Sequence, residues 1–380
     1  MRRATAPVNA IAPGFDLPST LKATLSADYD LFGIQFGADY IYSQVIQQVQ
    51  FSDARSVVVG RLPDGRPRYA ARTSAGGISF TDTNTDIVLG NTDRGRGHVF
   101  DVRAAKTFDW GLSLGGSYTW QDVKDATPAT SSTALSNYGN GAMVDPNFAA
   151  YGRSNDETRW AFKYNIGFDH AFFGDYRTAI QLFGETRAGR NYSFTMIDQG
   201  AGTGRSPVFG TLSNNNRYLL YVPTGANDPL VSYDNANTQT QLEGLISNTE
   251  LNKYRGRIAG RNIARSRAFT RIDLHLEQEV PTFIGKSRVT LFGDIENLPN
   301  LLNSKWGGLR QLAFPSTASV VTVQCLAVAT PTGATAVPNA NAGQTCAQYR
   351  YSSFREPATA VSPVFNGSLY LIRLGARFTF

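Results

Sequence analysis

Charged residues, cysteine and histidine are all scarce in this 380-residue chain. Charged residues make up 17%, below the usual quarter of a soluble globular protein. The three histidines, His98, His170 and His275, lie on separate segments without the spacing of metal ligands, so no metal site is predicted. No run of 18 apolar residues occurs, which excludes a membrane-spanning helix.

An excess of charge of one sign is also missing. The formal net charge is +6, and the basic residues are scattered singly, so no nucleic-acid surface is predicted. Residues 1–18 hold two arginines but no apolar core long enough for a signal peptide. If the protein is exported, we expect the export signal to lie upstream of this sequence.

Catalytic motifs are lacking as well. Asp294 and Glu296 share one face of a predicted strand, as do Asp273 and Glu277, and paired carboxylates can serve acid–base catalysis. Nearby arginines such as Arg271 make ion pairing the simpler interpretation. We therefore predict neither an enzyme, catalytic residues nor a cofactor.

Aromatic residues and glycine are abundant, with 12% aromatics and 36 glycines, a composition that favours strands and turns. Apolar and polar residues alternate with period two in separated segments. The clearest are residues 110–121, 160–168, 176–188, 268–277, 286–297 and 370–380, and weaker ones occupy 19–29, 33–45 and 97–107. Ile41, Phe183, Phe292 and Leu371 break the pattern on otherwise polar faces. About nine antiparallel strands are predicted, and the fold class is all-β.

The connections between these strands alternate strictly between short and long. The links near residues 31–32, 109, 171–174 and 280–285 are tight, whereas 51–96, 125–157, 194–263 and 298–366 are long and rich in small and polar residues. Hairpins with short turns at one end and long loops at the other are typical of outer-membrane β-barrels. A strand of about 12 residues, tilted by about 40°, crosses roughly 30 Å, enough for the apolar band of that membrane.

Aromatic residues fall at two levels if the short turns lie in the periplasm. This topology predicts two aromatic girdles at the membrane interfaces, formed by Trp110, Phe168 and Phe378 at the inner level and by Tyr118, Trp120, Trp160 and Tyr370 at the outer level. A barrel of eight to ten strands has its lumen filled by side chains, but the inward faces here carry charges and small residues. We therefore expect a wider transmembrane barrel, of which residues 1–380 form part.

Two stretches resemble TonB-dependent outer-membrane receptors. Residues 291–306, LFGDIENLPNLLNSKW, are similar to the Asn-Leu-x-Asn-Leu-Leu-Asn element of the penultimate strand in that family, and residues 374–380, LGARFTF, to its last strand. Residues 217–223 and 260–263, with Asp273 and residues 278–281, resemble the Oar-like branch.

The resemblance implies a 22-stranded barrel around an N-terminal plug, with residues 1–380 as its C-terminal portion of about nine strands. The plug, the early strands and the segment that contacts the TonB complex lie outside this sequence. The implied function is TonB-energised uptake of an unidentified substrate across the cell outer membrane. The implied partners are outer-membrane lipid and lipopolysaccharide, the barrel-assembly machinery, and the TonB complex through the absent N-terminal region.

Three further groups of residues are candidate sites. The terminal Phe380 resembles the signal read by the barrel-assembly machinery, or is simply a girdle aromatic. Cys325 and Cys346 lie in one stretch that is poor in charge, which suggests a disulfide in an oxidising compartment, with two unpaired thiols as the alternative. Ligand binding is expected in the long extracellular loops. Five aromatic residues of these loops could contact substrate or, as the alternative, pack the loops together: Tyr192, Phe194, Tyr218, Tyr221 and Tyr351.

Two other functions remain open at this stage. One is a passive outer-membrane channel or structural barrel, complete in this chain or after self-association. The other is a secreted soluble β-rich protein that binds carbohydrate or a partner.

Overall fold

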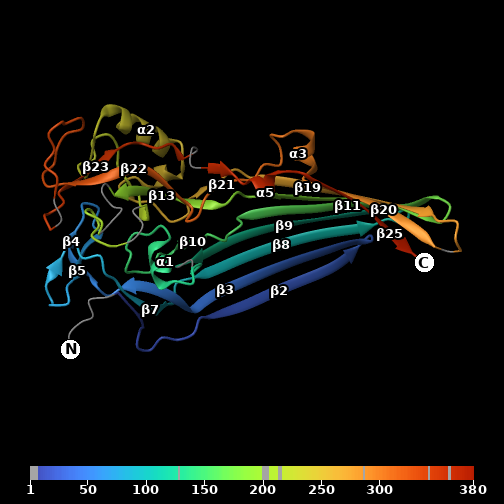
Figure 1. Ribbon diagram of the computed structural model, residues 1–380, viewed down its shortest axis with the longest axis horizontal. Coiled ribbons are helices and arrows are strands. Elements are labelled where there is room, and N and C mark those ends of the chain that lie inside the picture. The colour runs from blue at the N-terminus through green and yellow to red at the C-terminus, as the bar shows by residue number, and fades with distance from the viewer. Residues whose placement is uncertain are drawn as a thin grey trace.

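The computed structural model describes residues 7–126, 129–198, 205–212, 216–285, 287–340, 343–357 and 361–380. Strands account for 52% of the residues and helices for 9%, so the chain is all-β as predicted. The molecule has two parts, a sheet of long strands and a compact group of short elements at one end of it (Figure 1).

Nine long strands form an antiparallel meander in which each strand pairs with the next one along the chain. They are β2 (Ser19–Leu31), β3 (Ile34–Asp53), β8 (Arg96–Thr107), β9 (Leu112–Asp125), β11 (Trp160–Phe173), β12 (Tyr176–Arg187), β19 (Phe269–Pro281), β20 (Arg288–Glu296) and β25 (Leu371–Thr379). The number and positions agree with the alternation of the sequence. The three segments with the weaker pattern also prove to be long strands, namely β2, β3 and β8.

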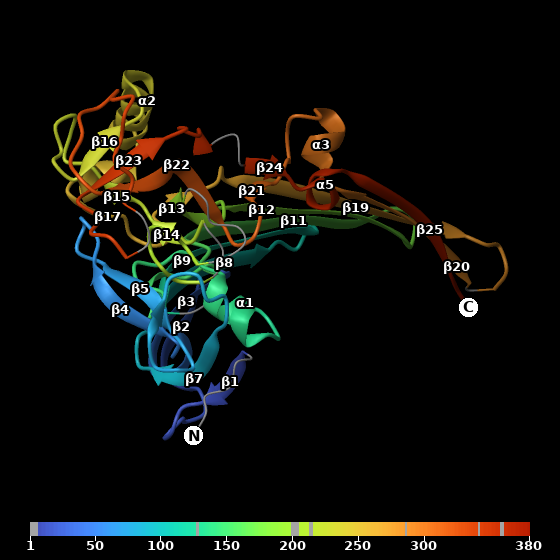
Figure 2. The ribbon, with the colours of Figure 1, turned by 60° about the vertical axis from the view of Figure 1, so that its left-hand side comes forward.

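The sheet is curved and open (Figure 2). Within the described residues, β2 pairs only with β3, and β25 pairs only with β20. The described part of the chain thus forms a curved wall and does not close into a barrel. Three shorter strands extend the sheet near the second part of the molecule: β1 (Val8–Ile11), β7 (Asp86–Thr92) and β10 (Gly152–Arg153).

Tight turns join the strands at one end of the sheet. Phe32 and Gly33, between β2 and β3, have φ values of 56° and 68°, and positive φ at both central positions suits the twist of a two-residue hairpin. The other short links are 108–111, 174–175 and 282–287. The long connections all leave from the opposite end, as the sequence predicts.

The long connections fold into a second body, here called the connection module: the described residues of 54–95, 126–159, 188–268 and 310–357, of which β7 and β10 also pair with the long sheet. Its main sheet has the order β14-β13-β22-β23-β16, with β18 beside β13. Those strands are β13 (Asn191–Asp198), β14 (Tyr218–Leu219), β16 (Val231–Tyr233), β18 (Ala264–Arg265), β22 (Thr317–Leu326) and β23 (Gln348–Ser352). The sequence predicts loops here, and that expectation is too simple.

Smaller elements complete the two parts. In the connection module they are β4 (Ser56–Arg61), β5 (Pro67–Arg72), β6 (Ile78–Ser79), β15 (Tyr221–Val222), β17 (Arg257–Ile258), β21 (Arg310–Leu312), α1 (Ala134–Gly139), α2 (Ala236–Ser247) and the 3-10 helix η1 (Glu250–Tyr254). Before the last strand lie α3 (Leu298–Leu302), β24 (Val361–Pro363) and α5 (Phe365–Ser368). Asn235 caps α2 by accepting a hydrogen bond from the Thr238 N–H.

The connection module has the apolar core that the long sheet lacks. Met196, Leu220, Leu242, Val321 and Tyr351 are all completely buried in one cluster. Burial of each such side chain contributes about 1.5–3 kcal/mol. Two of the strand pairs that enclose this core, β13 with β22 and β16 with β23, are parallel and join distant parts of the chain.

Candidate functional surfaces

One face of the nine-stranded sheet is apolar from edge to edge. Because directly paired residues lie on the same face, the strand register aligns apolar side chains into rows. One row runs from Leu114 through Ile166, Leu182, Leu274 and Ile295 to Ile372. Many of these side chains are exposed, such as Ile166 at 45% and Leu374 at 83%. A continuous exposed apolar face of this kind marks an interaction surface or a lipid contact.

The seven residues predicted as aromatic girdles lie at the two ends of this apolar sheet. Tyr118, Trp120 and Trp160 lie toward the connection module, where Trp120 and Trp160 are directly paired. Tyr370 immediately precedes β25 at the same end. Near the short turns, the ring centroid of Trp110 lies 6.2 Å from that of Phe168. Phe378, near the end of β25, pairs with Val289 at that level.

The opposite face of the sheet carries the charges. Arg271 Nε lies 2.8 Å from Asp273 Oδ1, and its Nη2 lies 2.9 Å from Glu296 Oε2. Arg373 on β25 also pairs with Glu296, so this network joins three strands. A second network centres on Arg103 of β8, which pairs with Asp28 and Asp39. The paired carboxylates considered for catalysis are therefore engaged in ion pairs.

His275 belongs to the same polar face. Its Nδ1 lies 2.6 Å from Asp294 Oδ1, and its Nε2 lies 3.3 Å from Glu277 Oε1. His275 and Asp294 border a shallow hollow of about 610 Å³ on the polar face. Among the described residues, no group of three or more His, Cys, Asp or Glu side chains is placed to hold a metal ion.

The loop aromatics that could contact a ligand lie mostly inside the connection module. Phe194, Tyr218, Tyr221 and Tyr351 are at most 4% exposed, so their rings pack the module core instead of facing solvent. Tyr221 donates a hydrogen bond to Asp228 Oδ2, and burial raises the pKa of its phenol. Of the five, only Tyr192 is partly exposed, and it borders a cleft in the part of the module next to the long strands.

Two arginines of that cleft, Arg153 and Arg265, were not predicted from the sequence, and neither was Glu157, the carboxylate that both contact. Arg153 and Glu157 are four residues apart, whereas Arg265 comes from another connection and meets them only after folding. The one available signal was the presence of several arginines close to the predicted strand ends, and that signal is shared by many other positions.

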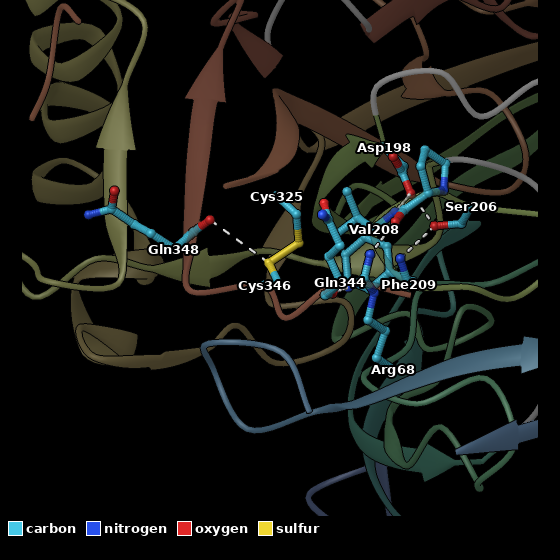
Figure 3. The surroundings of a disulfide bond; sticks show 10 residues. Arg68, Asp198, Ser206, Val208, Phe209, Cys325, Gln344, Cys346 and Gln348 are labelled. Carbon is cyan, nitrogen blue, oxygen red and sulfur yellow. Dashed lines mark hydrogen bonds between the residues drawn. A yellow bond between two sulfur atoms is a disulfide. The ribbon is translucent and has the colours of Figure 1, made fainter. Parts of the chain in front are cut away.

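Cys325 and Cys346 form a disulfide with a Cα–Cα distance of 5.3 Å. The bond is buried, and the segment around Cys346 reaches the Arg68 side chain through the Gln344 carbonyl (Figure 3). Arg68 also donates to the Pro207 carbonyl at 2.8 Å. Nearby, Ser206 and the Val208 N–H donate to Asp198, and burial raises the pKa of this carboxyl to about 7.

Asn297 shows why the Asn-rich stretch after β20 has its particular sequence. The residue is buried and has a φ of 55°, a left-handed conformation that asparagine tolerates better than most residues. Its side-chain amide donates to the Gly307 and Ser368 carbonyls at 3.0 and 2.8 Å. This residue therefore connects the end of β20 to the segment that enters β25.

The terminal Phe380 is completely exposed and stacks beside Phe378, with ring centroids 6.0 Å apart. This position is compatible with both predicted roles, the assembly signal and the girdle aromatic.

Comparison with models of known protein families and with curated protein sequences found no match. Among the described residues, no helix has the length and apolar character needed to cross a membrane.

Proposed function

We propose that this chain forms part of the wall of an outer-membrane receptor barrel of the TonB-dependent type. In this proposal the apolar face contacts lipid, the ion-paired face lines the lumen, the short turns lie in the periplasm and the connection module lies outside the cell. Substrate uptake would be energised by the TonB complex through an N-terminal region that this sequence does not include. The observation that carries the proposal is the exposed apolar face that continues across all nine strands.

The distribution of charge supports a contact with hydrocarbon. Charged side chains of the strands lie almost entirely on the polar face, and those that share the apolar face, such as Lys106 and Asp122, lie close to strand ends. A lysine or arginine facing lipid costs about 2–4 kcal/mol at the membrane midplane and much less near the interfaces. A sheet with both faces in water would not need to keep its charged side chains on one face.

The open edges favour a larger wall over a small complete channel. In a meander of nine antiparallel strands, the first and last strands point in the same direction. Direct pairing of β25 with β2 would therefore be parallel. The same holds for a ring of several copies of this chain with one orientation in the membrane, where β25 of one copy would pair in parallel with β2 of the next. Single-chain outer-membrane barrels of bacteria are antiparallel with an even strand number. An odd number of further strands between β25 and β2 would satisfy that rule.

Membrane fractionation and tryptophan quenching test the proposal. The chain is expressed with an export signal in a Gram-negative host, and we expect it in the outer-membrane fraction, resistant to a carbonate wash and soluble only in detergent. After reconstitution, lipids brominated on their acyl chains should quench Trp120 and Trp160 more than the aqueous quencher acrylamide does. The variant Trp306→Phe removes the one tryptophan of the sequence that is not predicted to lie in a girdle, so the remaining signal comes from Trp110, Trp120 and Trp160.

A protein that is released by carbonate and stays monodisperse without detergent would contradict the proposal. That result would favour the secreted β-rich protein instead. Acrylamide quenching of Trp120 and Trp160 without quenching by brominated lipid would have the same meaning.

A further inference from the structure

The cleft beside Tyr192 has a volume of about 930 Å³ and lies in the part of the connection module next to the long strands. It lies between β10, β13, β18 and the segment that joins α2 to η1. Its lining includes Arg153, Arg159, Tyr192, Glu250, Tyr254 and Arg265. Arg159 directly precedes β11, and Arg265 ends β18 shortly before β19 begins at Phe269, so the cleft lies where the module meets the long strands.

Positive charge exceeds negative charge inside this cleft. Arg153 Nε lies 3.3 Å from Glu157 Oε1, and Arg265 Nη2 lies 3.7 Å from the same oxygen. Two guanidinium groups thus share one carboxylate, whose side chain is completely buried. The third arginine, Arg159, is already paired with Asp122 at 2.8 Å.

The guanidinium groups of Arg153 and Arg265 can each donate a hydrogen bond to a further acceptor. Arg265 donates through Nε to the Asn191 side chain at 3.0 Å, while its Nη2, within the described residues, makes only the long contact with Glu157. Burial lowers the pKa of Arg265, with Arg153 and Arg159 adding to the effect and Glu157 and Glu250 opposing it. A bound anion would add a negative charge beside two arginines that share one carboxylate.

Aromatic rings supply the apolar part of the cleft. Tyr192 packs edge-on against Phe194, with centroids 5.5 Å apart, and Tyr254 lines the cleft from the η1 helix. The acidic residue in the lining is Glu250, which pairs with Lys253 at 2.8 Å, and Glu356 lies near Tyr192. Aromatic rings beside a cationic fork form a surface suited to a planar acid.

We propose that this cleft binds an organic anion, with its carboxylate on Arg153 and Arg265 and its planar apolar part against Tyr192 and Tyr254. As the substrate site of a receptor, this assignment rests on the proposed function. As a binding site, it depends only on the connection module.

Equilibrium dialysis of the full chain in detergent, with radiolabelled benzoate as the probe, tests this inference. Benzyl alcohol, which has the same ring without the charge, is the matched ligand control. We expect benzoate to bind at least tenfold more tightly than benzyl alcohol. Arg265→Gln and Arg153→Gln should each weaken benzoate binding roughly tenfold or more, because each removes a charge-assisted hydrogen bond. Arg310→Gln, which changes an exposed arginine outside the cleft, should leave binding unchanged.

Two further variants keep the test decisive if loss of an arginine unfolds the module around Glu157. Arg265→Lys retains the positive charge but loses the planar fork and should bind benzoate with intermediate affinity. Tyr192→Leu retains both arginines and should weaken benzoate and benzyl alcohol by the same factor.

Equal binding of benzoate and benzyl alcohol, or wild-type affinity in folded Arg153→Gln and Arg265→Gln variants, overturns the assignment. The outcome is separable from that of the proposed function. A protein that binds benzoate through these arginines but leaves the membrane in carbonate retains the site and loses the receptor role.

Discussion

The long strands expose their apolar side chains, whereas the connection module buries its own. Leu374 of β25 is 83% exposed, and Met196 of β13 is completely buried. The charges also differ in placement, since the sheet pairs its charges on one face, whereas the module encloses charged groups such as Arg66, Asp198 and Arg205. A single chain thus contains two parts built for different solvents, and the boundary between them lies where the strands meet the long connections.

This contrast explains how each part is stabilised. Exposed or half-exposed ion pairs, such as those of Arg271 and Arg103, contribute about 0–1 kcal/mol each in water, so they do not hold the sheet together by themselves. Backbone pairing along nine strands and a lipid-facing surface account for the sheet. The module resembles an ordinary globular body, with a core, a disulfide and a capped helix.

Ile166→Lys tests the contrast most severely. Ile166 lies midway along β11 on the apolar face. In a lipid-facing wall, the lysine should lower the free energy of unfolding by about 2–4 kcal/mol. The measurement is urea unfolding of the protein reconstituted in vesicles.

Its neighbour provides a matched control, because Asn165→Lys places the same charge one residue away on the polar face. We expect that variant to be close to wild type. Equal loss of stability in both variants would show that the two faces meet the same solvent.

Removal of the disulfide should act on the connection module alone. The bond closes a loop with a sequence separation of 21, for which the loss of chain entropy in the unfolded state corresponds to about 3 kcal/mol. Replacing both Cys325 and Cys346 by serine should lower the stability of the module by roughly that amount, as followed by near-ultraviolet circular dichroism of its tyrosines. A similar loss in the long strands, followed through Trp120 and Trp160, would mean that the two parts unfold together.

Asp198 should make the stability of the module depend on pH. Burial raises the pKa of this carboxyl from 3.8 to about 7, so the folded state retains a proton that the unfolded state has released. The contribution of this proton to the free energy of unfolding is fully present below about pH 4 and is lost as the pH rises through about 7. Unfolding free energy should therefore fall by on the order of 2 kcal/mol between about pH 5 and pH 8.

Asp198→Asn should remove that slope, since the amide does not titrate. Asp156→Asn changes an exposed carboxylate of the same module and should retain the slope. An unchanged pH profile in Asp198→Asn would assign the dependence to another group.

The long strands were predictable from the sequence, and the connection module was not. Alternation between apolar and polar residues is local, so segments such as 160–168 reveal both the strand and its two faces. The module depends on parallel pairs such as Ser193 with Thr317, which no local pattern marks. For the same reason Tyr192 was recognised as a candidate, whereas Arg153, Glu157 and Arg265 became visible only through their contacts.

The Asn-rich stretch lies on the boundary between the two parts, and it carries the smallest of the expected effects. Asn297→Ala removes two buried hydrogen bonds to the Gly307 and Ser368 carbonyls and places alanine at a φ of 55°. We expect a loss of roughly 1–2 kcal/mol, together with earlier hydrogen exchange in β20 and β25. Asn303→Ala serves as the control because Asn303 is exposed and its side chain accepts only one hydrogen bond, from the Lys305 N–H. Equal effects of the two substitutions would mean that Asn297 does not hold the last two strands together, and that the stretch matters for a reason other than stability.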